Sequence, residues 1–187
     1  MKKSTIAALV FNGLSSQHAF AQTEKGNWLV GVNVADLHYS KDRNYDIKQY
    51  GISLQPDAGY FVADRLAVGA GLELTLTGYK AENSFSGEIN KGHTIVYGLS
   101  PFVRYYFLDA SKHKVYGQAF GSYRESYSKF PYGSSSDNEW GVGISAGYNY
   151  FITPSVALAA GPYFNRYDSY DLGLFLGLQV FLPGRSE

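Results

Sequence analysis

The stretch LGLFLGLQVFL at residues 172–182 places an apolar residue at every second position. Its even positions are all Leu or Val, whereas its odd positions include Gly173, Gly177 and Gln179. Successive side chains of a β-strand point to opposite faces of the sheet, so this period of two indicates a strand with two different faces. The length also matches the roughly 9–11 residues with which a tilted strand crosses a bilayer.

The same alternation recurs along the chain. We expect eight strands, at residues 28–34, 50–62, 66–77, 94–107, 115–124, 140–150, 158–165 and 172–182. Three connections read as tight turns, at 63–65, 109–114 and 153–155, and three as polar loops, at 40–46, 80–92 and 128–139, while a last one at 167–171 is short. Short turns at one end and longer loops at the other are typical of outer-membrane barrels. The pattern therefore predicts an all-β fold, an eight-stranded antiparallel up-and-down transmembrane β-barrel.

The first residues have the features of a secretory signal peptide. Lys2 and Lys3 precede an apolar segment at 6–11, and Ala19-Phe20-Ala21 supplies the small-x-small pattern of a cleavage site. We therefore predict a signal peptide at residues 1–21 and an outer-membrane β-barrel domain at residues 22–187.

Composition excludes several function classes. Lys and Arg balance Asp and Glu at 16 each, which argues against a nucleic-acid partner. The chain has no Cys, which excludes a disulfide framework, a thiolate zinc site and a Cys nucleophile. No run of residues approaches the ~18 apolar positions of a membrane-spanning helix, so a helical membrane protein is excluded.

Alternation alone does not say which face points outward, and a soluble barrel with its apolar face inside is the alternative. The face opposite the apolar one consists mainly of Gly, Ser, Ala, Thr and Asn, with very few charged residues. An eight-stranded barrel is just wide enough inside to be filled by side chains, so small residues fit the lumen and Leu rows fit lipid. Aromatic residues near the strand ends match the two girdles of membrane barrels. The first group is Trp28, Tyr60, Tyr105, Phe107, Tyr148 and Tyr150, and the second is Tyr39, Tyr50, Tyr79, Tyr127, Trp140 and Tyr167.

Two segments carry a resemblance to a known family, GYFVADRLAVG at residues 59–69 and PFVRYYF at residues 101–107. The chain resembles small outer-membrane β-barrels such as the OmpX and OmpA transmembrane domains, and in particular the outer membrane protein beta-barrel domain family common in Bacteroidetes-type bacteria. The resemblance implies a place in the outer membrane of a Gram-negative cell envelope, contact with outer-membrane lipids, insertion by the barrel-assembly machinery, and a monomer. Most members of that family have no known enzymatic role, which implies a protein without catalysis or cofactor.

Four charged residues fall on the inward parity of neighbouring strands: Asp57, Glu73, Arg104 and Arg124. A lone buried charge is costly, so we expect these residues to form a polar network that plugs the lumen. The strands of Glu73 and Arg104 are adjacent, which makes these two the first expected pair. The alternative is a narrow path for ions or water.

Motifs for catalysis are weak. GISAG at residues 143–147 matches G-x-S-x-G, but it falls inside a continuous strand, whereas a nucleophile elbow needs a sharp strand-to-helix turn. His38-Tyr39-Ser40 resembles the His-x-Ser element of outer-membrane lipid A deacylases. The four His residues are scattered without metal-ligand spacing, so we expect no catalytic residue and no metal site.

The expected function is a structural or surface-interaction role carried by the extracellular loops. Exposed aromatic residues suit recognition, and the candidates for such a contact surface are Tyr127, Phe130, Tyr132 and Tyr170. The alternatives are a small porin-like pore and a lipid A-modifying enzyme.

Overall fold

The eight strands form one closed antiparallel barrel. The structure is a computed structural model and describes residues 22–42, 47–82, 89–131, 133–168 and 170–184, with the side chains of 36–49 and 81–90 left aside. The strands are β1 (Trp28–Asp42), β2 (Ile47–Ala63), β3 (Leu66–Glu82), β4 (Ile89–Asp109), β5 (His113–Phe130), β6 (Gly133–Phe151), β7 (Val156–Arg166) and β8 (Tyr170–Leu182).

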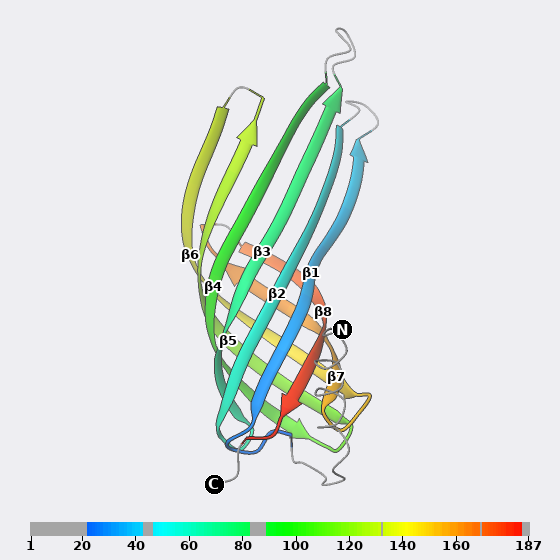
Figure 1. Cartoon of the computed structure of the whole chain (residues 1–187), viewed down its shortest axis with the longest axis vertical. Helices are drawn as coiled ribbons and strands as arrows, with labels where there is room; N and C mark the ends of the chain where they lie inside the picture. The colour runs from blue at the N-terminus through cyan, green and yellow to red at the C-terminus, as the bar shows by residue number, and fades with distance from the viewer. Residues whose placement is uncertain (1–21, 43–46, 83–88, 132, 169, 185–187) are drawn as a thin grey trace, which may run out of the picture.

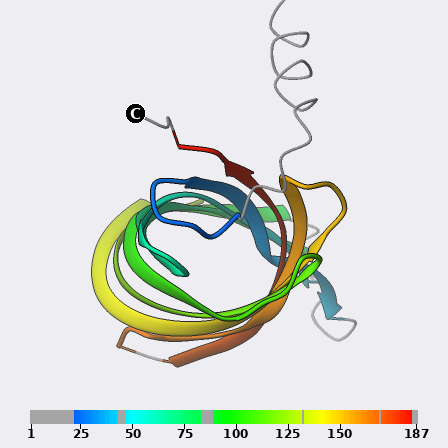
Figure 2. The ribbon, with the colours of Figure 1, turned by 90° about the horizontal axis from the view of Figure 1, so that it is seen from below.

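Each strand pairs with its neighbours in sequence, and β1 closes the ring by pairing with β8. Figure 1 shows the tilted strands from the side, and Figure 2 shows the ring from below. The predicted fold is confirmed. No helix in the described ranges is long and apolar enough to cross a membrane. The predicted signal peptide at residues 1–21 lies outside the described residues.

The apolar face points outward, as predicted. On β8, Leu174 and Leu176 are 71% and 67% exposed, whereas Phe175 between them is 6% exposed. The same contrast runs around the barrel, because Val30, Leu72, Val103 and Ile144 are exposed while their neighbours on the other parity are buried or partly buried. Exposed apolar rows on every wall suit a lipid solvent rather than water. The alternative, a soluble barrel with its apolar face inside, is therefore wrong.

Much of what the sequence suggests as long loops is paired strand. The predicted loop at 80–92 contains the end of β3 and the start of β4, where Lys80 still pairs with Lys91. The predicted loop at 128–139 likewise contains paired residues of β5 and β6, from Ser128↔Ser135 outward to Phe130↔Gly133. The prediction missed these pairs because both faces are polar there, and backbone hydrogen bonds continue without any hydrophobic alternation.

The wall of the barrel has uneven height. At one end, which we call the turn end, short turns join β2 to β3, β4 to β5 and β6 to β7. At the other, the loop end, β1 to β6 all rise above the short β7–β8 hairpin (Figure 1). β7 ends where Arg166 pairs with Val142, so among the described residues 133–141 of β6 pair with β5 alone. We call the raised part of β3–β6, residues 77–82, 89–94, 126–130 and 133–141, the arm.

The lumen at the turn end is filled with aromatic rings rather than with small residues alone. The rings of Phe61, Tyr106 and Phe151 are buried, and each contacts a neighbour in the cluster, at centroid distances of 5.8 Å for Phe61–Tyr106 and 5.0 Å for Phe151–Phe181. Tyr116 extends the cluster at 5.3 Å from Tyr106. The sequence-based expectation that small residues fill the lumen is therefore wrong at the turn end.

The segment before β1 lies across the turn end. Thr23 is 1% exposed, and its hydroxyl donates to the Asp109 carboxylate at 2.7 Å. The Arg65 amide donates to the Thr23 carbonyl at 2.7 Å, and the Gly26 amide donates to the Phe61 carbonyl at 2.9 Å. Asp109 also pairs with the buried ammonium of Lys114. Residues 22–27 therefore cover the aromatic cluster from outside.

Candidate functional site: the polar lumen and the outer rim

The first charged layer of the lumen is a buried pair between β2 and β4. Arg104 is 1% exposed, and its Nη2 donates to Asp57 Oδ2 at 2.9 Å. Its Nε donates to Gln118 Oε1 on β5 at 2.7 Å. The guanidinium carbon also lies 4.3 Å from the ring centroid of Tyr116 and 5.1 Å from that of Phe102. This arginine therefore ties three strands together across the bore.

The second charged layer lies nearer the loop end, around Arg124 of β5. Its Nη2 donates to Glu139 Oε2 at 2.6 Å, and its Nη1 lies 3.9 Å from Glu73 Oε1. The Tyr167 ring covers the guanidinium at 3.5 Å. This layer is more open to water than the first, because the Arg124 side chain is 28% exposed.

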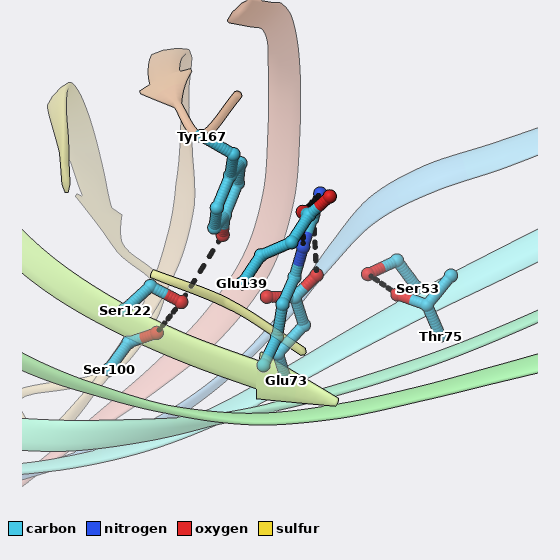
Figure 3. A network of polar contacts seen from close by, with 8 residues as sticks. Ser53, Glu73, Thr75, Ser100, Ser122, Glu139 and Tyr167 are labelled. Atoms are coloured by element: carbon cyan, nitrogen blue, oxygen red, sulfur yellow. Dashed lines mark hydrogen bonds and ion pairs between the residues drawn. The ribbon is translucent and has the colours of Figure 1, made fainter. Parts of the chain in front are cut away.

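Hydroxyl groups extend the second layer along the lumen wall. Tyr167 donates to Ser122 Oγ at 3.2 Å, and Ser100 Oγ donates to Ser122 Oγ at 3.1 Å. Thr75 donates to Ser53 Oγ at 2.8 Å between the adjoining strands β3 and β2. Figure 3 shows these contacts with Glu73 and Glu139 pointing toward the same charged centre. The layer spans β2 to β6.

The four predicted lumen charges thus lie in the lumen, but the expected pair Glu73–Arg104 is wrong. Arg104 pairs with Asp57, and Glu73 lies beside Arg124. The register explains the difference, because Glu73 is opposite Gly98 whereas Arg104 is opposite Ala67. Six residues of strand separate the two levels, about 20 Å at the usual rise per residue. Adjacency of strands says nothing about this offset, which the tilt of a barrel makes large.

A small cavity of about 70 Å³ lies between the two layers. Asn33, Asp57, Arg104 and Asn165 line it, and each has one buried polar atom without a partner among the described residues: Asn33 Oδ1, Asp57 Oδ1, Arg104 Nη1 and Asn165 Oδ1. A polar space of this size suits a few water molecules that bridge such atoms. Toward the turn end it meets the aromatic cluster.

The predicted aromatic girdle has most of its members on the outer surface. At the turn end Trp28 is 49% exposed and packs on Tyr60 at 5.1 Å, and Tyr105 and Tyr148 are exposed on the same rim. At the loop end Trp140 is 76% exposed and packs on Tyr123 at 4.7 Å. The prediction is wrong for Tyr167 of the loop-end aromatic group, because its ring covers Arg124 inside the lumen.

The weak catalytic motifs do not form a site in the described residues. Ser145 lies within β6, where it pairs with Gln118 and Tyr163 in uninterrupted strand. The side chains of His38 and Ser40 fall outside the described part, as does Tyr132. The parts of the chain that the structure describes contain no group of three or more His, Cys, Asp or Glu residues able to hold a metal ion. Of the four aromatic residues proposed as a contact surface, Tyr127, Phe130 and Tyr170 are exposed.

Several solved structures share this fold. The outer membrane protein OprG of Pseudomonas aeruginosa has 12% identity, with 87% of this chain and 99% of that chain covered and a TM-score of 0.61. Neisserial surface protein A has 21% identity, with 83% and 97% covered and a TM-score of 0.52. The attachment invasion locus protein Ail of Yersinia pestis, in complex with the heparin analogue sucrose octasulfate, has 16% identity, with 84% and 99% covered and a TM-score of 0.55. None of the three names denotes an enzymatic activity.

Comparison with curated protein sequences finds no match. Residues 6–176, however, match the family described as the outer membrane protein beta-barrel domain. This match covers most of the 187 residues and agrees with the closed barrel and its apolar outer wall. The chain therefore belongs to the outer membrane protein beta-barrel domain family, and it lies in the outer membrane.

Proposed function

We propose that the protein is a surface-recognition barrel in which the arm binds an extended polypeptide and the lumen has a structural role only. The observation that carries the proposal is the strand edge of β6. Residues 133–141 pair with β5 on one side, and the short β7 does not reach them on the other. In a barrel of this type the loop end faces the outside of the cell.

A free strand edge presents a row of backbone N–H and C=O groups that a partner strand completes. The sequence of this edge, GSSSDNEWG, is polar, and its side chains from Gly133 to Asn138 are exposed. Charged and polar residues such as Asp137 protect an open strand edge from non-specific pairing with other chains. The facing edge of β1 is open in the same way, because β8 pairs with β1 only from Trp28 to Val34.

The filled lumen supports this assignment over a pore. Arg104 and Asp57 block the centre, and the aromatic cluster with residues 22–27 covers the turn end. Ser145 of the G-x-S-x-G match lies in uninterrupted strand, whereas a nucleophile elbow needs a sharp turn, which favours binding over that catalytic use. Ail, which shares the fold, is an attachment protein by its name.

Surrounding lipids and the assembly machinery belong to the same proposal as partners, and the barrel acts as a monomer. Closure of β1 on β8 leaves the membrane-spanning ring without an edge, so no second copy is needed to complete it.

A peptide-display experiment tests the proposal. The protein in lipid nanodiscs is used to select from a library of random 12-residue peptides, and hydrogen exchange then locates the protected amides. We expect enriched peptides to protect residues 133–141. A library without binders, or binders that protect other regions only, would contradict the proposal.

Two matched deletions sharpen the test. Replacing residues 126–137 by Asn-Gly leaves Glu125 and Asn138, which are cross-strand partners, joined by a two-residue hairpin turn. Replacing residues 80–91 by Asn-Gly shortens the β3–β4 hairpin in the same way between Tyr79 and Gly92. The first variant should lose most peptide binding and the second should keep it, because only the first shortens the open edge of β6, by residues 133–137.

A further inference from the structure

The outer wall carries a hollow between β4 and β7 that the surface-recognition proposal does not use. Two adjoining hollows of about 600 and 670 Å³ share Pro101, Gly121, Val142 and Arg166 in their linings. The open space is clearest above Gly121, where an added Cβ would meet no atom within 4 Å. This hollow, which we call the outer groove, opens toward lipid rather than toward the lumen.

Three small or ring-shaped residues make the floor of the outer groove. Pro101, Ala119 and Gly121 lie on outward positions of β4 and β5, among the larger Leu99, Val103 and Tyr123. Pro101 has no amide hydrogen, and the β4–β5 register passes from Leu99↔Tyr123 to Phe102↔Phe120. The wall thus combines a gap in pairing with side chains too small to cover it.

The outer groove is lined by one cationic side chain. Arg166, the last residue of β7, is exposed and lines both hollows. Among the described residues no carboxylate pairs with it, whereas Arg65, Arg104 and Arg124 each have an acidic partner. An unpaired charge on a lipid-facing wall is costly unless its side chain reaches the membrane interface, where water and anionic headgroups are available.

Aromatic residues mark that interface next to Arg166. Trp140 and Tyr123 line the same hollow and pack on each other at 4.7 Å. Such rings lie at the level of lipid headgroups. The outer groove therefore combines an apolar trough in the acyl region with a cation near the headgroup level, at the loop end of the barrel.

We propose that the outer groove binds one acyl chain of an anionic lipid of the surrounding membrane, with the lipid phosphate on the Arg166 guanidinium. The apolar lining of the groove contacts the lipid acyl chain. Arg166 selects lipids with a net negative charge, because a guanidinium binds phosphate through paired hydrogen bonds. This is a specific lipid site in addition to the general lipid contact of the barrel.

Native mass spectrometry of the detergent-solubilised barrel tests the site, with phosphatidylglycerol and phosphatidylcholine of identical chains added in equal amounts. The wild type should retain phosphatidylglycerol in preference, by about fivefold for one cation near an anionic headgroup. Arg166→Gln should remove the preference and Arg166→Lys should keep most of it. Lys129→Gln, which removes a cation exposed elsewhere, should change nothing.

Filling the groove tests the chain contact separately. Gly121→Leu places a side chain into open space, so the barrel should fold and retain less of both lipids. Ala58→Leu adds the same kind of bulk to an outward position of β2 and should leave retention unchanged. Heat-modifiable gel migration verifies folding, and Ala119→Leu fills the same floor should Gly121→Leu fail to fold. Equal retention of the two lipids by the wild type, or full retention by a folded variant with a filled groove, would overturn the proposal.

Discussion

Replacing Arg104 by Leu should destabilise the barrel strongly, because Arg104 holds together the buried centre of the lumen. The substitution leaves the Asp57 carboxylate, at 9% exposure, without its counter-charge and leaves Gln118 Oε1 without its donor. Breaking a buried pair by removing one partner typically costs about 3–5 kcal/mol. The lost stacking of the guanidinium on Tyr116, at 4.3 Å, acts in the same direction.

Two further variants distinguish the loss of the buried ion pair from the non-specific effect of a substitution in the lumen. Arg124→Leu removes a side chain that is 28% exposed and paired near water, so its cost should be about 1 kcal/mol or less. The double variant Asp57→Leu with Arg104→Leu removes both charges and should recover most of the loss of Arg104→Leu, since a buried pair replaced by apolar residues is often near neutral.

The assay is equilibrium urea unfolding in lipid vesicles, followed by the fluorescence of the two tryptophans, Trp28 and Trp140. A loss below about 1 kcal/mol for Arg104→Leu would refute the reasoning, since it would place Asp57 in contact with water. A double variant less stable than Arg104→Leu would also refute it.

Three other predictions follow from the same geometry. In planar bilayers the wild type should show no steady conductance because rings and the Arg104–Asp57 pair fill the bore, and regular channel steps would contradict the filled lumen. Gly147→Leu should abolish the heat-dependent gel shift of the folded barrel, since its Cβ would overlap the buried Tyr116 ring, whereas Gly133→Leu, with nothing within 4 Å, should keep the shift. Thr23→Ala should lower the free energy of unfolding by about 1 kcal/mol through the lost bond to Asp109, and an unchanged urea midpoint would show that residues 22–27 do not hold the turn end.

The strand count and the direction of the faces were predictable from sequence because both rest on a period of two. Leu172 to Leu182 show this directly, with Leu174 and Leu176 on lipid and Phe175 inside. A strand that crosses a bilayer must keep an apolar outer face along its whole length, so the signal persists for ten residues or more. The closure of β1 on β8 follows from the need to leave no edge in lipid.

The arm and the ion pairs were not predictable in the same way. Ser128 to Glu139 carry no alternation, since both faces of the raised strands meet water, and the pairing there rests on backbone bonds alone. The Arg104–Asp57 pair depends on register and tilt, which place Arg104 opposite Ala67 and far from Glu73 along β3. The aromatic filling was missed because Phe151 and Phe181 are apolar residues at inward positions, where the sequence pattern favours small ones.

Lipid contact at alternate positions of β8 tests the central claim of an apolar wall facing lipid around a filled lumen. In a background with Trp28→Phe and Trp140→Phe, single tryptophans replace Leu174, Phe175 and Leu176 in turn, and lipids with brominated acyl chains quench those in contact. We expect strong quenching at 174 and 176, where the native side chains are 71% and 67% exposed, and weak quenching at 175. Stronger quenching at 175 than at its two neighbours would contradict the claim.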